Sequence, residues 1–233
     1  MKQEVELQRE YYTRTASHYD ELHADETPAL ALGLLDAVIA AHGIRSVLDV
    51  GSGTGRVVEH LHRNHPDLRV VGVEPVEALR SVGHQRGLAP DMLVDGDATN
   101  LGYPDDSFDL VCAFSTLHHI PVPSEAVGEM LRVASRGIFI LDANNFGQGG
   151  PLARLAKRWI YRFGLWPIAE WIKTRGKGYR DTPGDGIAYT YSVFQSYRQI
   201  RAQSKSMHML GVADSDGDLF RTCPVVALLA LKR

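Results

Sequence analysis

Apolar and polar positions alternate along the chain in a pattern that predicts buried strands separated by amphipathic helices. Short apolar runs are typical of strands in a buried parallel sheet, and apolar residues three and four positions apart are typical of helices. The predicted strands are 46–50, 69–74, 91–94, 108–114 and 137–142, and the predicted helices are 28–42, 54–64, 76–85, 124–133 and 191–201. Strands and helices that alternate in this way imply a parallel sheet with right-handed crossovers.

Two more apolar runs, 206–212 and 221–231, lie at the end of the sequence. The segment between them, 214–218, contains the aspartates and glycine of a turn, so the two runs predict an antiparallel hairpin. We therefore expect a single α/β domain over residues 1–233. Its seven-stranded sheet is mostly parallel with a C-terminal antiparallel hairpin, and helices cover both faces.

The composition favours a folded protein without a membrane span. Hydrophobic residues make up 44% of the 233 residues, which supplies a core. The longest apolar run, 225–231, is far shorter than the stretch of roughly 18 residues that spans a bilayer. The polar N-terminus does not resemble a secretory signal. Cys112 and Cys223 lie in apolar runs, which favours reduced thiols. We expect a cytoplasmic protein.

A glycine-rich loop, 51–55, follows the first predicted strand and leads into a helix. Glycine allows positive φ and a close approach of the backbone to a ligand, and the N-terminus of the helix offers free N–H groups. Glu74 ends the next strand, where a carboxylate can accept both hydroxyls of a ribose. Arg56 stands where a dinucleotide fingerprint has glycine, so the pattern argues against an NAD-dependent oxidoreductase.

The motif Asp49-x-Gly51-x-Gly53-x-Gly55 resembles the first motif of class I S-adenosylmethionine-dependent methyltransferases, in their small-molecule branch (methyltransferase type 11, UbiE-like). The resemblance implies a Rossmann-like sheet, S-adenosyl-L-methionine as cofactor and methyl transfer as the activity. It also implies that residues 1–26 form a lid over the cofactor. The residues that we predict to bind the cofactor are Tyr12, Tyr19, Asp49, Gly51, Ser52, Gly53, Gly55, Arg56, Glu74, Pro75, Asp97, Ala98, Phe114 and Ser115.

Within this set the resemblance assigns individual roles. Glu74 would bind the ribose, and Asp97 and Ala98, after the third strand, would bind the adenine. Tyr12 and Tyr19 would close over the methionine end. A non-catalytic module that retains the fold is a rival interpretation, and the intact glycine loop argues against it.

Polar residues follow the fourth and fifth predicted strands at the same edge of the sheet. His118 and His119 are the candidate general bases, and packing beneath the cofactor is their alternative role. Asp142, Asn144 and Asn145 are candidate acceptor-binding residues, with turn formation as the alternative. No metal site is expected.

The segment 146–186 is predicted to be an insertion that determines substrate specificity. Its part 151–180 carries eight basic residues and one acid, although the whole chain has a net charge of −3. Five large aromatic residues are interleaved with the basic ones: Trp159, Tyr161, Phe163, Trp166 and Trp171. We expect a helical cap over the active site, with Arg158 and Arg162 binding an acceptor that bears a carboxylate or phosphate.

Two other interpretations of 151–180 remain. The first is a solvated basic helix face, and the second is a membrane-surface helix that serves a lipid-linked or peptide acceptor. No nucleic-acid partner is expected, because the net charge of −3 is unsuited to coating nucleic acid. In addition, Phe114-Ser-Thr-Leu117 follows the fourth strand in place of an Asn-Pro-Pro-aromatic base-flipping tetrad.

Overall fold

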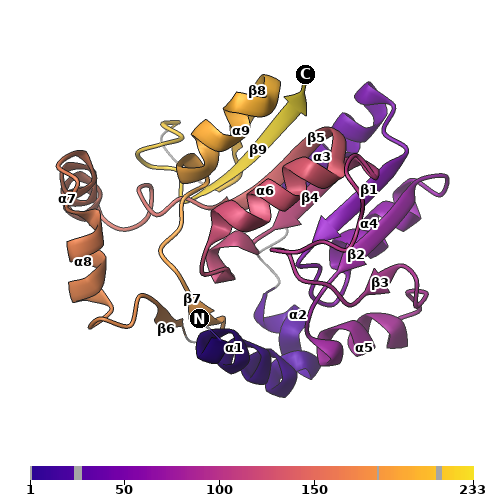
Figure 1. Ribbon diagram of the computed structural model, residues 1–233, viewed down its shortest axis with the longest axis horizontal. Coiled ribbons are helices and arrows are strands. Elements are labelled where there is room, and N and C mark those ends of the chain that lie inside the picture. Colours follow the sequence, from indigo (N-terminus) through magenta and orange to yellow (C-terminus); the bar gives the residue numbers. More distant parts are fainter. Residues whose placement is uncertain (1, 24–27, 183, 214–216) are drawn as a thin grey trace.

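A twisted sheet of seven strands runs through the computed structural model, with helices packed on both of its faces (Figure 1). The structure describes residues 2–23, 28–182, 184–213 and 217–233. The strand order is β3-β2-β1-β4-β5-β9-β8; β1 to β5 are parallel, whereas β9 is antiparallel to both β5 and β8. This arrangement confirms the predicted fold class. The strands of the sheet are β1 (Ser46–Val50), β2 (Arg69–Val73), β3 (Leu93–Val94), β4 (Phe108–Phe114), β5 (Ala134–Ala143), β8 (Ser204–Gly211) and β9 (Val225–Lys232).

The predicted helices are present, with differences at their ends, and the largest difference is at 191–201, where a 3-10 helix, η4 (Val193–Ser196), precedes the α-helix. Helix α3 begins at Ala29 rather than Pro28, which adopts an extended φ of −63° and ψ of 139° just before it. Thr27, which would cap this helix, lies outside the described residues, as do 214–216 of the predicted turn. The helices are α1 (Lys2–Thr15), α2 (Tyr19–Leu22), α3 (Ala29–His42), α4 (Arg56–Asn64), α5 (Glu77–Gln85), α6 (Pro123–Val133), α7 (Pro151–Arg162), α8 (Trp166–Lys173) and α9 (Tyr197–Gln203).

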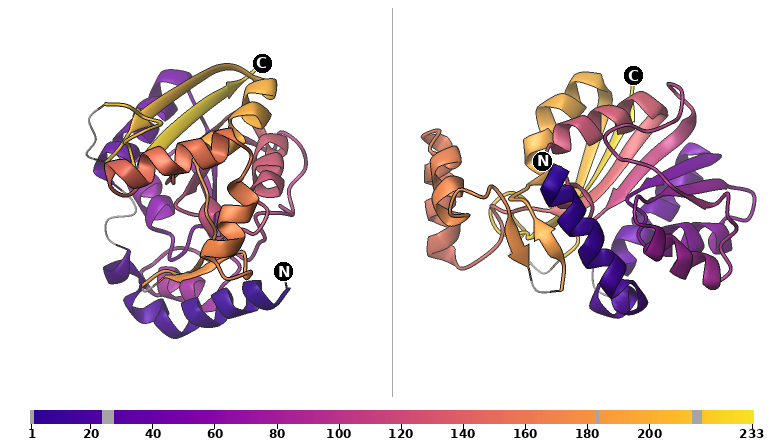
Figure 2. Two further views of the ribbon diagram at one scale, coloured as in Figure 1. Left: turned by 90° about the vertical axis from the view of Figure 1, so that its left-hand side faces the viewer. Right: turned by 60° about the horizontal axis from the view of Figure 1, so that its bottom comes forward.

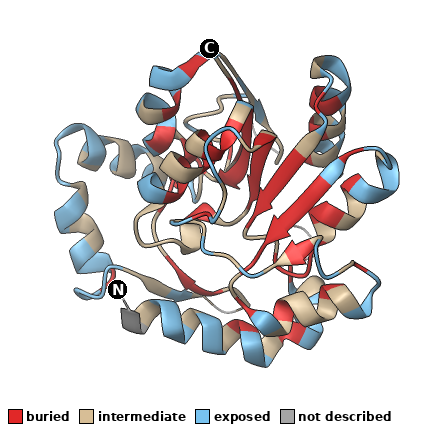
Figure 3. Ribbon diagram, turned by 45° about the vertical axis from the view of Figure 1, so that its right-hand side comes forward, coloured by how far each residue is buried: buried red, intermediate tan, exposed pale blue. Residues whose placement is uncertain are grey.

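Alternate residues of the strands point into two separate hydrophobic cores, because side chains on a strand alternate between the faces of the sheet. Leu110 packs with residues of α3 and α4 on one face. Its neighbour Val111 packs with residues of α6 and α9 on the other. Figure 3 shows the buried strands between more exposed helices. Burial on both faces explains why the strands read as continuous apolar runs.

Two parts of the chain lie outside this layered body. Helix α1 lies near the carboxyl ends of the parallel strands and packs against α5 and strand β7 (Figure 2). Helices α7 and α8 stand away from the sheet, and a two-stranded hairpin, β6 (Arg180–Thr182) and β7 (Gly186–Ala188), connects them back to it (Figures 1 and 2). The sequence did not predict this hairpin. No helix in the described segments is long and apolar enough to cross a membrane.

Candidate active site

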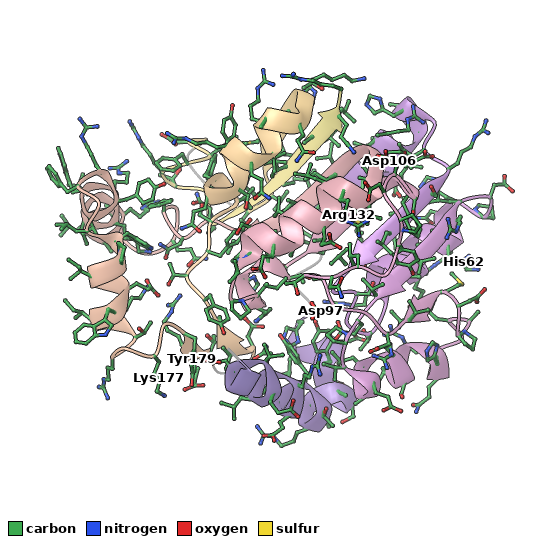
Figure 4. The ribbon with its side chains drawn as sticks, in the orientation of Figure 1. His62, Asp97, Asp106, Arg132, Lys177 and Tyr179 are labelled. Atoms are coloured by element: carbon green, nitrogen blue, oxygen red, sulfur yellow. The ribbon has the colours of Figure 1, made fainter. Side chains whose placement is uncertain are left out.

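A cavity of about 490 Å³ opens at the carboxyl edge of the sheet, between the loops that follow β1, β2, β3 and β4 and the covering helix α1. Nine residues predicted from the sequence line it: Tyr12, Tyr19, Gly51, Glu74, Pro75, Asp97, Ala98, Ser115 and His119. In Figure 4, Asp97 lies between the sheet and helix α1. Ligands of open α/β sheets bind at this edge, and the volume suits a small-molecule ligand.

The glycine loop between β1 and α4 lies at one end of the cavity. Gly51, Gly53 and Gly55 all adopt positive φ, at 72°, 57° and 80°, which side chains rarely allow. A Cβ atom on Gly53 would lie 3.0 Å from the ring of Tyr19, and one on Gly51 would overlap Thr116. The three glycines therefore permit both the turn and the close packing of residues above it.

Glu74 connects the glycine loop to the start of α5. Its Oε2 accepts a hydrogen bond of 3.0 Å from the Gly53 N–H, and its Oε1 accepts one of 2.9 Å from the Val76 N–H. Burial raises the pKa of Glu74 to about 7, although both backbone hydrogen bonds oppose the rise. The cavity is therefore lined by a fixed carboxylate that titrates near neutral pH.

A small second pocket of about 20 Å³ lies beside the cavity and shares Tyr19 and Gly51 with it. Four further predicted residues line this pocket: Asp49, Ser52, Arg56 and Phe114. Asp49 accepts a 2.5 Å hydrogen bond from the Ser52 hydroxyl, and burial raises the pKa of its carboxyl group to about 6. These residues support the glycine loop from behind.

Two polar loop residues also line the cavity, Asp97 and Ser115. The Asp97 carboxylate accepts a hydrogen bond of 2.8 Å from the N–H of Thr99, which shapes the loop after β3. Ser115, directly after β4, has a φ of 51°, an uncommon conformation for a residue with a side chain. Its N–H donates to the Leu141 carbonyl at 2.7 Å. This bond holds the strained residue at the cavity wall.

The segment predicted to be a lid contains α1, a short 3-10 helix (Ala16–His18) and α2. Asp20, on α2, fixes the end of this segment to the glycine loop. The Asp20 Oδ1 accepts a 2.5 Å hydrogen bond from the Thr54 hydroxyl, and the Asp20 carboxylate forms ion pairs with Arg86 and Arg56. Gln8, on α1, donates a hydrogen bond to the Asp185 carbonyl at 3.1 Å and accepts one from the Ile187 N–H. The lid therefore contacts both the glycine loop and the β6–β7 hairpin. Residues 24–26 of the predicted lid lie outside the described part of the chain.

The two candidate bases lie in a short 3-10 helix, η3 (Leu117–His119), after β4. His118 Nδ1 is 2.8 Å from Asp142 Oδ1, and its Nε2 is 3.4 Å from Asp185 Oδ2. Burial lowers the pKa of His118, but the carboxylates of Asp142 and Asp185 outweigh it and raise the pKa to about 10, since nearby negative charge favours the charged imidazole. Held between two carboxylates in this way, His118 does not face a substrate as a general base.

None of the predicted acceptor-binding residues lines the cavity. The lining formed by described residues includes none of Asp142, Asn144, Asn145, Arg158 and Arg162, and it also omits His118. Asp142 positions η3 through a 2.7 Å hydrogen bond from the Leu117 N–H. Asn144 is buried, and its side-chain amide donates to the carbonyl groups of Leu219, Phe220 and Cys223. These bonds give it a structural role.

Sequence reasoning missed several residues around the site. Val5, Gln8 and Arg9 of α1 line the cavity, and no spacing in the sequence distinguishes them from other helix residues. Asp185 lies between Gly184 and Gly186, a turn signal that could have drawn attention to it. Its partners are far away in sequence, so only the fold reveals its environment.

Comparison with known proteins identifies the group to which this arrangement belongs. Residues 48–141 match the family model described as a methyltransferase domain. The chain is 30% identical over 197 residues to the demethylmenaquinone methyltransferase of Roseiflexus castenholzii, an alignment that covers 81% of this chain and 77% of that protein. The chain belongs to the S-adenosylmethionine-dependent methyltransferases. It is also 33% identical over 138 residues to the phosphatidylethanolamine N-methyltransferase of Cereibacter sphaeroides, covering 52% of this chain and 61% of that one.

Solved structures show the same methyltransferase fold. A protein from Pyrococcus horikoshii superposes with a TM-score of 0.61 at 15% identity and covers 96% of this chain and 99% of its own. A SAM-dependent methyltransferase from Thermotoga maritima gives 0.58 at 20% identity, covering 95% and 98%. S-adenosylmethionine is the cofactor of this family. The residues of the cavity fit it, because the buried Glu74 carboxylate can accept hydrogen bonds from the two ribose hydroxyls. The adjoining loop consists largely of glycines, so no large side chain blocks the approach of the ligand to its backbone.

Proposed function

We propose that this methyltransferase transfers a methyl group to a small-molecule acceptor by direct displacement in the cavity beneath α1. The observation that carries the proposal is that Glu74, Gly51 of the glycine loop and Asp97 line one cavity together with Tyr12 and Tyr19. Bound S-adenosylmethionine supplies a methyl group on an activated sulfonium leaving group. The protein therefore has to align the two reactants and exclude water.

We assign these tasks to separate parts of the site. Glu74 holds the ribose, and Asp97 and Ala98 hold the adenine, as the family resemblance implies. Tyr12 and Tyr19, whose rings contact each other edge to face at 5.5 Å, form an aromatic cover at the end nearest His119. Since His118 is paired with two carboxylates, alignment contributes more to the proposed mechanism than an imidazole base does.

The test of this function is detection of a product heavier by one methylene after incubation with S-adenosylmethionine and candidate acceptors. A long-chain quinone precursor and an aminolipid are the first candidates, because two relatives carry names with such substrates. The proposal requires S-adenosylhomocysteine and methylated product in equal amounts. If the protein binds NAD and not S-adenosylhomocysteine, the oxidoreductase alternative replaces it.

A second proposal concerns the surface on which the protein encounters its acceptor. It differs from the helical cap over the active site that the sequence predicts. Leu152, Leu155 and Trp159 of α7 and Phe163, which directly follows this helix, form one exposed apolar stripe, and Ile168, Trp171 and Ile172 of α8 form another. Phe163 and Trp171 are each 66% exposed, whereas Lys157 turns inward to the Asn145 carbonyl at 2.8 Å. An outward apolar stripe is the reverse of normal helix packing and indicates an interaction surface.

We propose an anionic membrane surface as the partner of α7 and α8, with a lipid-like acceptor. Aromatic and aliphatic side chains on a helix rich in arginine and lysine suit the boundary between headgroups and acyl chains. The anionic acceptor expected from the sequence has less support, because the described residues of the cavity lining include one arginine, Arg9, no lysine, and the acids Glu6, Glu74, Asp97 and Glu125. The expected cytoplasmic location stays a prediction.

Co-sedimentation with vesicles of phosphatidylglycerol and phosphatidylcholine tests this surface. Replacing Trp159 and Phe163 by serine should reduce the bound fraction at least tenfold, and raising the salt concentration should weaken binding of the unaltered protein. Tyr197→Ser is the matched control, since Tyr197 is 40% exposed on α9, away from this surface. Equal binding by the double variant would contradict the proposal.

A further inference from the structure

Three histidines from two parts of the chain surround the carboxylate of Asp185. His119 Nε2 lies 2.9 Å from Asp185 Oδ1, His118 Nε2 lies 3.4 Å from Oδ2, and His23 Nε2 lies 3.5 Å from Oδ1. His23 follows helix α2, the other two histidines lie on η3, and Asp185 lies between β6 and β7. The lid, the sheet edge and the insertion therefore meet at one carboxylate.

The second nitrogen of each imidazole fixes which nitrogen faces Asp185. His118 Nδ1 lies 2.8 Å from a carboxylate oxygen of Asp142. His119 Nδ1 lies 2.7 Å from the Ile187 carbonyl, and His23 Nδ1 lies 2.7 Å from the Tyr19 carbonyl. These three partners are acceptors, so each Nδ1 donates its proton to the partner named, although Gln8 Nε2 also lies 3.3 Å from His119 Nδ1. In the neutral tautomer, each Nε2 then directs its lone pair toward Asp185.

Imidazoles around a carboxylate need positive charge between them, either protons on the Nε2 atoms or a metal ion in place of the protons. We propose that His118, His119 and Asp185 bind one divalent transition-metal ion through the two Nε2 atoms and the carboxylate. Metal–nitrogen and metal–oxygen bonds of about 2.0–2.2 Å place neighbouring ligand atoms roughly 3.0–3.5 Å apart. The 3.4 Å from His118 Nε2 to Asp185 Oδ2 lies in this range and the 2.9 Å from His119 Nε2 to Oδ1 lies just below it, and the ligand atoms of the three residues lie within 4.8 Å of one another.

The surroundings of the three ligands are those of a metal site. Metal-binding histidines usually donate their other N–H to a carboxylate or a backbone carbonyl, which fixes the ring and the tautomer. Asp142 does this for His118, and the Ile187 carbonyl does it for His119. Asp142 is fully buried and is itself fixed by the Leu117 N–H, so it acts as a positioning residue.

The ligand set also indicates the class of ion. Two imidazoles and one carboxylate suit Zn²⁺, Fe²⁺ or Co²⁺, whereas Mg²⁺ and Ca²⁺ prefer oxygen ligands alone. Tyr12 Oη lies 3.1 Å from His119 Nε2, and both residues line the cavity. The ion would join three segments that enclose the cavity: the lid through Tyr12, the sheet edge through η3 and the insertion through Asp185. This role is independent of the identity of the methyl acceptor.

The test is metal binding by the full-length protein after removal of metals with a chelator. Titration with Co²⁺ should give one equivalent bound and visible absorption bands that Zn²⁺ abolishes by displacement. At a free Zn²⁺ concentration about 100-fold above the dissociation constant, the melting temperature should rise by roughly 5–10 °C. His119→Ala and Asp185→Ala should each weaken binding at least 100-fold, and Asp142→Asn should weaken it by about 10–100-fold.

The chain contains a matched control for these variants. Asp36 also pairs with two imidazoles, His60 Nε2 at 2.9 Å and His65 Nε2 at 2.8 Å, on the α3 and α4 side of the sheet. His60→Ala should leave Co²⁺ binding and its spectrum unchanged. If the dissociation constants of the wild-type protein for Co²⁺ and Zn²⁺ are about 100 μM or higher, protons and not a metal ion occupy the cluster, and the proposal is wrong. Equal binding by wild type and by folded Asp185→Ala protein would place the metal elsewhere and would also overturn it.

Discussion

Glu74 and Gly53 are joined by a 3.0 Å hydrogen bond that links the end of β2 to the glycine loop. Together with the bond from the Val76 N–H, it restricts the Glu74 side chain and holds the carboxylate at the cavity wall. The geometry also explains why the motif needs glycine at 53: the N–H must reach Glu74 while the opposite side of the residue packs against Tyr19.

Replacing the carboxylate of Glu74 tests its role in cofactor binding. We expect Glu74→Gln to weaken S-adenosylhomocysteine binding by about 1.5–3 kcal/mol, the usual loss for hydrogen bonds to a charged group. Isothermal calorimetry measures the change. Glu77→Gln is the control, because Glu77 is exposed on the adjoining helix. Unchanged affinity in Glu74→Gln would remove Glu74 from the binding site.

The pH dependence of binding should report the same group. Because burial raises the pKa of Glu74 to about 7, the carboxylate that accepts the ribose hydroxyls is mostly protonated at pH 6. We expect affinity for S-adenosylhomocysteine to rise roughly tenfold between pH 6 and pH 8. The rise should disappear in Glu74→Gln, and an identical pH curve in that variant would assign the titration to another group.

Protein stability should show the opposite trend in the absence of ligand. The folded state keeps the Glu74 proton up to about pH 7, whereas the unfolded chain releases it near the ordinary value of 4.5. The unfolded state therefore binds fewer protons across this window, and the free energy of unfolding contributed by Glu74 falls as the pH rises from 4.5 to 7. Urea denaturation across this range should show a shallower decline for Glu74→Gln.

Gly53 should tolerate no side chain if the cofactor is to bind. A Cβ atom there would lie 3.0 Å from the Tyr19 ring, at a backbone φ of 57°. Positive φ is especially unfavourable for β-branched residues. We expect Gly53→Val to abolish S-adenosylhomocysteine binding while circular dichroism still shows a folded protein. Gly33→Ala, within α3 and with nothing within 4 Å of its Cβ position, is the control and should bind normally.

The contact between lid and hairpin should matter more for turnover than for folding. Gln8→Ala removes the hydrogen bonds from α1 to Asp185 and Ile187, so the lid should open more often. We expect turnover to fall at least tenfold, with a loss of about 1–2 kcal/mol in stability. Glu10→Ala, an exposed position on the same helix, should change neither quantity. Full turnover by Gln8→Ala would show that lid contact is not required.

The sequence predicted the layered body of the fold well, because its strands are buried on both faces and bounded by turn residues. β1 and β4 have the residue ranges that their apolar runs predict. The insertion was harder to predict. Apolar residues at helical spacing in α7 indicate a helix, but the spacing does not reveal whether the apolar stripe faces the cavity or the solvent. The structure places it toward solvent.

The same distinction applies to the site. Residues in the local glycine motif could be assigned in advance, because the loop geometry depends on neighbours in the sequence. The surroundings of His118 depend on Asp142 and Asp185, which lie 24 and 67 positions further along the chain. No local sequence pattern indicates such distant contacts. The prediction of His118 as a base therefore could not take account of the two carboxylates beside it.

A crystal structure of the protein with S-adenosylhomocysteine tests the central claim most directly. The account predicts the nucleoside in the cavity beneath α1, with both ribose hydroxyls within hydrogen-bonding distance of Glu74 and the adenine beside Asp97 and Ala98. The homocysteine end should lie under Tyr12 and Tyr19. Density for the ligand at another site, or a ribose that does not contact Glu74, would contradict the account.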